Sequence, residues 1–309
     1  PDTYPTVLDG QNARRVIFIP SVTSPTLKGL TLQRGNAAGL GGDPTMPVDV
    51  GGSVYANGAS LTITNCRIVS STAGFGGGLG LYSGTLTITN SAVLSNTAHQ
   101  DLGGGTIRGS GGGLFLYHSS ATLFGNVVAN NVASGTQSYD GGGGMYMDAS
   151  SALIQGSMIQ DNLSTRAGGG FFIYQSNLGL QDSTIVDNWA AYLGGGGYAW
   201  LSSFDLASNY LINNFAATQG GGLDIWGCNP FTMTNNTFFL NHTLNNAPAI
   251  HVWGYQQSPI FQTSQGQLMH NTFAQNHAPY PWAIHVGRGT GTPTTTLAFT
   301  NTIFDQPGG

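Results

Sequence analysis

The sequence is poor in charged residues, which make up 7% of its 309 residues, and it contains no glutamate and a single lysine, Lys28. Residues that favour helices are therefore scarce, which argues against a helical fold. The net charge of −5 is spread thinly, and no basic cluster exists beyond Arg14 and Arg15, so we expect no nucleic-acid partner. No apolar run reaches the length of a transmembrane helix, and we expect no transmembrane segment in this chain.

Cysteine is also rare. Cys66 and Cys228 lie about six repeat units apart in the alignment below, beyond the reach of a disulfide, and we expect two free thiols. The chain opens at Pro1 without methionine or a signal peptide, which suggests a processed product or a fragment of a longer protein. The glycine-rich loop 103–105 lacks the lysine and following helix of a phosphate-binding loop, and we expect no cofactor.

What the chain does contain is a repeated unit, most clearly in residues 76–98. Three short runs in this unit, Leu79–Tyr82, Thr85–Thr89 and Ala92–Leu94, alternate apolar with small or polar residues, a pattern typical of β-strands. Glycine, serine and asparagine separate the runs and favour turns. Three strands and three bends would return the chain to its starting point.

The glycine-rich start of this unit recurs along the whole chain. Steps between successive copies run from about 25 to 35 residues around a base period near 26, which is the signature of a solenoid. The copies begin at Gly51, Gly76, Gly111, Gly142, Gly168, Gly195 and Gly220, followed by two degenerate copies at 248–252 and 282–286.

An asparagine that follows an apolar residue by three positions recurs in the same phase. Asparagines at the same bend of stacked coils can hydrogen-bond to one another and form an internal ladder. Asn36 also fits this pattern, whereas Ser71 interrupts it. The predicted structural ladder consists of Asn96, Asn131, Asn162, Asn188, Asn214, Asn241 and Asn276.

Together, the glycine-rich and asparagine motifs resemble the repeats of polymorphic outer-membrane proteins and of other right-handed parallel β-helix proteins, over most of residues 25–305. Residues 5–11 also resemble the first segment of pectate-lyase-like β-helices. The resemblance implies an all-β fold, a single-stranded right-handed parallel β-helix of about ten coils with three short strands each. We treat 1–309 as one domain.

Insertions fall at two places in the unit. Residues 36–49, 98–110 and 133–140 lie between the asparagine bend and the next glycine-rich strand, and 254–266 and 287–293 follow that strand. Insertions gathered around one face of a solenoid often mark its binding face. We therefore expect these segments to wall a groove over the glycine-rich sheet.

Two columns of side chains should point outward from that sheet, because residues alternate between its faces. Aromatic rings in these columns can stack on sugar rings, although overhanging loops or a neighbouring protomer could instead cover them, or they could simply be exposed. Aligning residues 195–200 as a copy of the unit also places Ala199 and Leu201 in the columns. The candidate ligand-binding residues are Tyr55, Tyr82, Phe115, Tyr117, Tyr146, Phe172, Tyr174, Trp226 and Trp253.

Asp148, Asp224, His251 and His285 are the candidate catalytic residues. The last three follow one another in one column, where two imidazoles and a carboxylate could bind a divalent metal or transfer a proton. No serine or cysteine nucleophile accompanies them, and we assign no metal site. Glycoside hydrolysis needs two carboxylates about 5 to 10 Å apart, whereas Asp148 and Asp224 lie about three coils apart in the alignment.

The repeat resemblance and the lack of a complete catalytic set predict a non-catalytic scaffold or adhesin, extracellular or at the cell surface. Its expected partners are a polysaccharide or cell-surface glycan, or further copies of itself in a homo-oligomer or head-to-tail filament. The alternative is a polysaccharide lyase or glycoside hydrolase that acts in the groove over the glycine-rich sheet.

Overall fold

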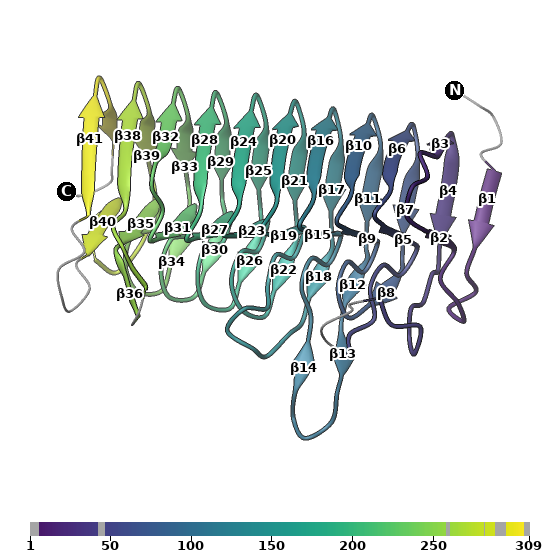
Figure 1. Ribbon diagram of the computed structural model, residues 1–309. Coiled ribbons are helices and arrows are strands. Elements are labelled where there is room, and N and C mark those ends of the chain that lie inside the picture. The colour runs from purple at the N-terminus through teal and green to yellow at the C-terminus, as the bar shows by residue number, and fades with distance from the viewer. Residues whose placement is uncertain (1–5, 43–46, 258–259, 281, 288–294, 306–309) are drawn as a thin grey trace.

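A computed structural model describes residues 6–42, 47–257, 260–280, 282–287 and 295–305. These residues form a parallel β-helix in which each strand of a coil pairs with the equivalent strand of the next coil. The coils stack along one axis, and the first and last strands lie at opposite ends of the molecule (Figure 1). The predicted all-β solenoid of about ten turns is confirmed, and no helix occurs among the described residues.

The glycine-rich sheet has ten strands, which carry the candidate ligand-binding residues. They are β2 (Ile17–Ile19), β5 (Val54–Asn57), β9 (Leu79–Tyr82), β15 (Leu114–Tyr117), β19 (Met145–Asp148), β23 (Phe171–Tyr174), β27 (Gly197–Trp200), β31 (Leu223–Trp226), β35 (Ile250–Trp253) and β40 (Ile284–Gly287).

The second sheet follows the glycine-rich sheet in each coil. Its strands are β3 (Thr26–Lys28), β6 (Ser60–Thr64), β10 (Thr85–Thr89), β16 (Ser120–Phe124), β20 (Ser151–Gln155), β24 (Asn177–Gln181), β28 (Ser203–Ala207), β32 (Phe231–Thr234), β38 (Gln265–Met269) and β41 (Thr296–Thr300).

The third sheet completes the triangular coil. It contains β1 (Thr6–Asp9), β4 (Leu30–Gln33), β7 (Arg67–Val69), β11 (Ala92–Leu94), β17 (Val127–Ala129), β21 (Met158–Gln160), β25 (Thr184–Val186), β29 (Tyr210–Ile212), β33 (Thr237–Phe239), β39 (Thr272–Ala274) and β42 (Ile303–Asp305).

A fourth, minor sheet of two-residue strands follows the third sheet in the central coils, where the sequence predicted only a bend. Two residues are too few to show an alternating pattern. The minor strands are β8 (Thr72–Ala73), β12 (Thr97–Ala98), β18 (Val132–Ala133), β22 (Leu163–Ser164), β26 (Trp189–Ala190), β30 (Phe215–Ala216) and β34 (His242–Thr243).

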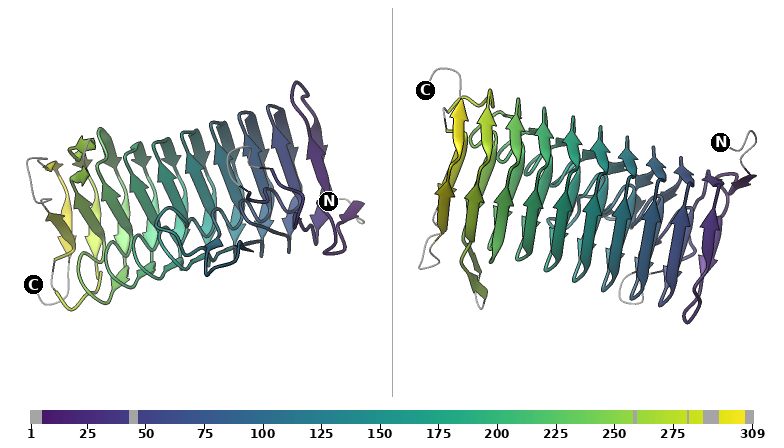
Figure 2. Two further views of the ribbon diagram at one scale, coloured as in Figure 1. Left: turned by 60° about the horizontal axis from the view of Figure 1, so that its bottom comes forward. Right: turned by 90° about the horizontal axis from the view of Figure 1, so that it is seen from above.

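Two antiparallel hairpins interrupt the coils. One is formed by β13 (Gln100–Asp101) and β14 (Ile107–Arg108), and the other by β36 (Tyr255–Gln257) and β37 (Ile260–Gln262). The hairpin β13–β14 projects from the side on which the minor sheet lies, and the views in Figure 2 show it among the loops along that edge. The predicted insertion at 287–293 lies, after Gly287, outside the described residues.

The predicted asparagines form a buried ladder at the bend between the third and minor sheets. From Asn96 to Asn276, the side-chain Nδ2 of each asparagine donates to the Oδ1 of the next at 3.0 Å. The backbone N–H of each also donates to that next Oδ1; for Asn162 the distance is 3.1 Å. The ladder thus supplies hydrogen-bond partners to backbone that turns inside the protein.

At its amino-terminal end this ladder differs from the expected pattern. Asn36 lies outside it and donates its Nδ2 to the carbonyl oxygen of Asn12. Gly35 takes the ladder position instead, with its N–H donating to Ser71 Oγ at 3.0 Å. Ser71 therefore continues the ladder, and its own N–H donates to Asn96 Oδ1 at 3.0 Å.

Similar ladders of serine and asparagine line the other two bends and include both cysteines. The N–H of Cys66 donates to Ser91 Oγ at 3.0 Å, and the N–H of Cys228 donates to Ser264 Oγ at 3.2 Å. Both thiols are free, as the sequence predicted, and both are buried. The cysteines therefore occupy positions that serine fills in neighbouring coils.

The interior of the coils is packed with aliphatic and aromatic side chains whose sizes are matched between neighbours. Gly197 occupies an inward position of β27, and a Cβ there would lie 2.2 Å from Cζ of Phe171 in the preceding coil. Phe231 fills the space beside Gly266 in the same way. A large ring in one coil is thus accommodated by the missing side chain of the next.

The pairing of β27 also corrects the sequence alignment. Tyr198 pairs with Phe172 and Trp200 with Tyr174, so these two residues, not Ala199 and Leu201, occupy the outward columns. The four consecutive glycines at 194–197 allowed an alignment shifted by one residue, and a shift of one exchanges the faces of a strand.

Candidate functional site: a pocket over the glycine-rich sheet

Much of the outward face of the glycine-rich sheet is covered rather than exposed. Tyr55, Phe115 and Tyr146 are each at most 4% exposed, and Phe172 is fully buried. They belong to a second hydrophobic cluster, outside the coils, that includes residues of the connecting segments such as Phe75. Of the three alternatives for the aromatic columns, coverage by loops of the same chain therefore applies to the column that contains these four residues.

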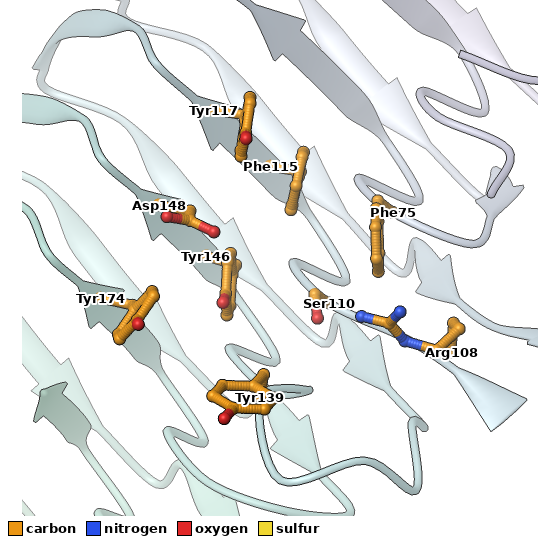
Figure 3. Close-up of a pocket in the computed structure, with 9 residues that line it drawn as sticks. All are labelled: Phe75, Arg108, Ser110, Phe115, Tyr117, Tyr139, Tyr146, Asp148 and Tyr174. Carbon is orange, nitrogen blue, oxygen red and sulfur yellow. The ribbon is translucent and has the colours of Figure 1, made fainter. Parts of the chain in front are cut away.

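A pocket of about 260 Å³, here called the tyrosine pocket, opens above β15, β19 and β23 (Figure 3). Arg108 comes from the hairpin β13–β14 and Tyr139 from the 133–140 insertion, so two of the predicted insertions do wall this part of the sheet. The pocket is lined by Phe75, Arg108, Ser110, Phe115, Tyr117, Tyr139, Tyr146, Asp148 and Tyr174.

Stacked rings form one side of the tyrosine pocket. The ring centroids of Phe75 and Phe115 lie 4.7 Å apart with an interplanar angle of 14°, and Tyr146 continues the stack 5.5 Å from Phe115. The guanidinium carbon of Arg108 lies 4.9 Å from the centre of the Phe75 ring. This packing fixes an apolar wall.

Arg108 is itself held by a buried carboxylate. Its Nε donates to Asp140 Oδ1 at 3.0 Å, and Asp140 is completely buried. Ser110 Oγ also donates to Asp140 Oδ1, at 3.3 Å. Asp140 thus compensates the charge of Arg108, and Asp148 contributes a carboxylate to the pocket lining.

The outer part of the pocket is polar and tyrosine-rich. Tyr117 and Tyr174 are half-buried, Tyr139 is half-exposed, and Asp148 lies between Tyr117 and Tyr174, with which it pairs in register, in Figure 3. Tyr139 also stacks on Trp200, with ring centroids 5.2 Å apart and an interplanar angle of 12°. Rings and hydroxyl groups therefore surround a single carboxylate.

Burial raises the pKa of two phenols in this pocket. The pKa of Tyr146 is raised well above its usual value, mainly by burial and also by the nearby Asp148 and Asp140 carboxylates. The pKa of Tyr174 is also raised, by burial first and then by Asp148. At neutral pH both phenols can donate hydrogen bonds, but neither is a tyrosinate that could accept a proton.

Asp224, His251 and His285 do lie in successive coils, but most of this group is buried. Asp224 Oδ1 lies 2.8 Å from His251 Nδ1, and these two side chains are at most 1% exposed. The rings of His251 and His285 stack nearly parallel, 5.3 Å apart, so their nitrogen lone pairs do not converge on one point. Among the described residues, no three His, Cys, Asp or Glu side chains are placed to hold a metal ion.

A second cavity, of about 230 Å³ and here called the arginine pocket, lies farther along the same face. Trp200, which stacks on Tyr139 of the tyrosine pocket, is part of the lining of the arginine pocket. The arginine pocket is lined by Ser138, Arg166, Ala167, Tyr192, Leu193, Tyr198, Trp200 and Trp226.

The structure distributes the predicted ligand-binding residues among several environments. Phe115, Tyr117, Tyr146 and Tyr174 line the tyrosine pocket, and Trp226 lines the arginine pocket. The remaining four, which line neither pocket, are Tyr55, Tyr82, Phe172 and Trp253.

The sequence pattern did not identify Tyr139, Tyr192, Tyr198 or Trp200 as candidates. Tyr139 and Tyr192 lie outside the glycine-rich strands, where no alternating pattern predicts the direction of a side chain. Tyr198 and Trp200 were missed through the shifted alignment, and keeping the aromatic residues in register would have found them.

Comparison with known proteins gives a family but no activity. The mannuronan C-5 epimerase AlgE6 A-module of Azotobacter vinelandii aligns over 95% of this chain and 84% of its own, with 11% identity and a TM-score of 0.36, and a likeness this distant carries no functional argument. No curated protein matches the sequence. No helix among the described residues is long and apolar enough to cross a membrane. Residues 106–306 match the family described as "Right handed beta helix region", and the chain belongs to this family of right-handed β-helices.

Proposed function

We propose that this protein is a non-catalytic carbohydrate-binding scaffold, of the adhesin type, and that the tyrosine pocket holds a sugar. The observation that carries the proposal is the arrangement of Tyr117, Tyr139 and Tyr174 around Asp148 in a pocket of about 260 Å³. Aromatic rings stack on the apolar faces of sugars, while a carboxylate and phenols bond to sugar hydroxyl groups.

The parallel sheet favours recognition of an extended chain. Stacked coils repeat every 4.8 Å or so, and the two pockets lie one after the other on the same face. A polysaccharide lying along the solenoid axis could therefore contact both. The rigid stack of coils would hold its contact residues at fixed spacing, which reduces the entropy lost on binding.

Binding without catalysis agrees with the chemistry of the pocket lining. Among the described residues that line it, Asp148 is the one carboxylate; Asp140 is buried and bonded to Arg108 and Ser110, and Asp224 lies three coils away, buried and bonded to His251. Three steps of about 4.8 Å exceed the 5 to 10 Å that separate the carboxylates of a glycoside hydrolase. The raised pKa values of Tyr146 and Tyr174 also disfavour the tyrosinate form of these two residues, which a lyase would need to abstract a proton from a uronate.

The decisive experiment compares glycan retention by the wild type and by the double variant Tyr117→Ala/Tyr174→Ala on a panel of immobilised neutral and acidic polysaccharides. We expect the double variant to lose at least about tenfold in affinity, because stacking on each ring contributes about 1 kcal/mol. Tyr210→Ala, which removes an exposed tyrosine from the third sheet, is the matched control and should bind as the wild type does. Unchanged retention by the double variant would refute the proposal.

A polysaccharide lyase or glycoside hydrolase remains the alternative, because Asp148 lies in the pocket. Assays for new reducing ends and for unsaturated products, on the same polysaccharides, separate the two functions. Product formation that Asp148→Asn abolishes would replace the scaffold proposal with an enzymatic one.

Location and assembly are further parts of the proposal. The repeat resemblance supports an extracellular or cell-surface place, to be checked by locating the protein in fractionated cells and culture medium. Association of copies into oligomers or head-to-tail filaments would appear as a mass that rises with protein concentration in light scattering.

A further inference from the structure

The arginine pocket differs from the tyrosine pocket in its charge. Its lining includes one cationic side chain, Arg166, and no carboxylate. The ion pairs found among the described residues join Asp9 to Arg34, Asp140 to Arg108 and Asp224 to His251, and none involves Arg166. In the part of the chain that the structure describes, the positive charge of Arg166 is therefore uncompensated.

Arg166 is nevertheless held in place. Its guanidinium carbon lies 4.5 Å from the centre of the Tyr192 ring, and the side chain is half-buried. Stacking uses the flat face of a guanidinium and leaves the N–H groups on its edge available. Such an ordered fork of donors matches the two oxygens of a carboxylate or sulfate group.

Two tryptophans in the same lining add donors that lack acceptors. The Nε1 atoms of Trp200 and Trp226 are both buried, and neither has a hydrogen-bond partner among the described residues. An indole N–H is a donor only, and leaving it buried and unpaired costs about 1 to 3 kcal/mol. A ligand with anionic oxygens that reached these N–H groups would provide the acceptors that they lack.

Asp224 is an acidic side chain beside this pocket, but it is engaged with another residue. Asp224 pairs in register with Tyr198 of the lining, but Asp224 is fully buried and its Oδ1 is bonded to His251. Burial, together with Asp224, raises the pKa of Tyr198 well above its usual value, so this phenol adds no negative charge. The pocket is thus a cationic site lined with donors in a protein whose net charge is −5.

We infer that the arginine pocket binds an anionic substituent, carboxylate or sulfate, of the glycan held in the neighbouring tyrosine pocket, so that the natural ligand is an acidic polysaccharide. This inference rests on the proposed function and assigns the two pockets different tasks. Tyr117 and Tyr174 contact the sugar ring, and Arg166 makes binding selective for anionic over neutral glycans. Tyr139, stacked on Trp200, lies between the two sites.

The test uses three polymers with one backbone: dextran, carboxymethyl dextran and dextran sulfate. We expect the wild type to bind at least one anionic form about tenfold or more tightly than dextran, with the difference falling as salt is added. The preferred polymer distinguishes carboxylate from sulfate. Arg166→Gln should remove the preference, whereas Arg67→Gln, which removes an exposed arginine of the third sheet, should leave it within about twofold.

Two further variants separate lost binding from lost structure. Trp226→Phe keeps a ring but removes the indole N–H, and should reduce the preference for the anionic polymer severalfold without lowering the thermal midpoint. Arg166→Lys keeps the charge and should retain part of the preference.

Different experimental results would contradict this inference and the proposed function. Equal binding of the three polymers, absence of binding to both anionic forms, or a preference that survives Arg166→Gln would overturn the assignment of the arginine pocket. None of these outcomes depends on Tyr117 and Tyr174, whose replacement tests the sugar-binding proposal separately.

Discussion

Replacing Asn188 by alanine should destabilise the protein far more than replacing an exposed asparagine by alanine. Asn188 lies in the middle of the asparagine ladder and is 1% exposed. Its Nδ2 donates to the carbonyl oxygen of Ile159 at 2.9 Å and to Asn214 Oδ1 at 3.0 Å. Its Oδ1 accepts from the backbone N–H and from Nδ2 of Asn162, at 3.1 and 3.0 Å.

The expected magnitude follows from the groups left without a partner. Alanine removes the side-chain partners of the Ile159 carbonyl and the Asn162 N–H, both inside the protein. At about 1 to 3 kcal/mol for each buried unpaired group, we expect the free energy of unfolding to fall by about 4 kcal/mol. Asn188→Ser should cost about half as much, because a serine hydroxyl can still accept one N–H, as Ser183 Oγ does from the N–H of Ser157 at 3.1 Å.

Urea unfolding at neutral pH, followed by circular dichroism and tryptophan fluorescence, measures the effect. Asn177→Ala is the matched control, because Asn177 is exposed in the same coil, and its cost should stay below about 0.5 kcal/mol. If the free energies of unfolding of Asn188→Ala and Asn177→Ala differ by less than about 1 kcal/mol, the ladder does not stabilise the coils to this extent.

Three further results are expected. Phe115→Ala should lower the free energy of unfolding by about 3 to 5 kcal/mol in the same urea assay, because this buried ring stacks between Phe75 and Tyr146; a loss below about 1 kcal/mol would contradict its role in the outer cluster. Burial raises the pKa of Cys228 from 9.0 to about 12. In a Cys66→Ser background, the Cys228 thiol should therefore react with Ellman's reagent at pH 8 only after unfolding. The contribution of this thiol to stability, present below pH 9, should disappear as the pH rises through 12. Burial also lowers the pKa of His285 from 6.5, so the contribution of this side chain to stability, present above pH 6.5, should disappear as the pH falls through the lowered pKa. His285→Phe should therefore reduce the drop in thermal midpoint between pH 7 and pH 5. An unchanged drop would count against this assignment.

The fold could be predicted from local strand patterns, from their repetition along the chain and from the resemblance that these repeats carry. The three strands expected in the unit at 76–98 have the same limits in the structure as β9, β10 and β11. Alternation determines which side chains point inward, and glycine, serine and asparagine mark the bends, so both features are present in single stretches of sequence. The minor strand β12 was missed because its two residues carry no period.

The candidate site was less predictable, because most of its walls come from outside the repeat. Arg108 and Tyr139 lie in insertions, and no pattern in a single sequence tells where such side chains return to the sheet. The covered state of Phe172 also depends on segments from other coils. Tyr117 and Tyr174 were found because they belong to the regular strands, whereas the neighbouring Trp200 was lost to a shift of one residue in a run of glycines.

The matched sizes of Phe171 and Gly197 have a consequence for how such a chain can grow. A solenoid is usually pictured as lengthened by copying one coil, with every copy fitting onto its neighbour. A copy of the coil that contains Phe171, inserted beside the original, would place two rings where the interior has room for one. At this place the heritable module is a pair of successive coils, and a duplication or deletion that keeps the pair together should fold where one that divides it does not.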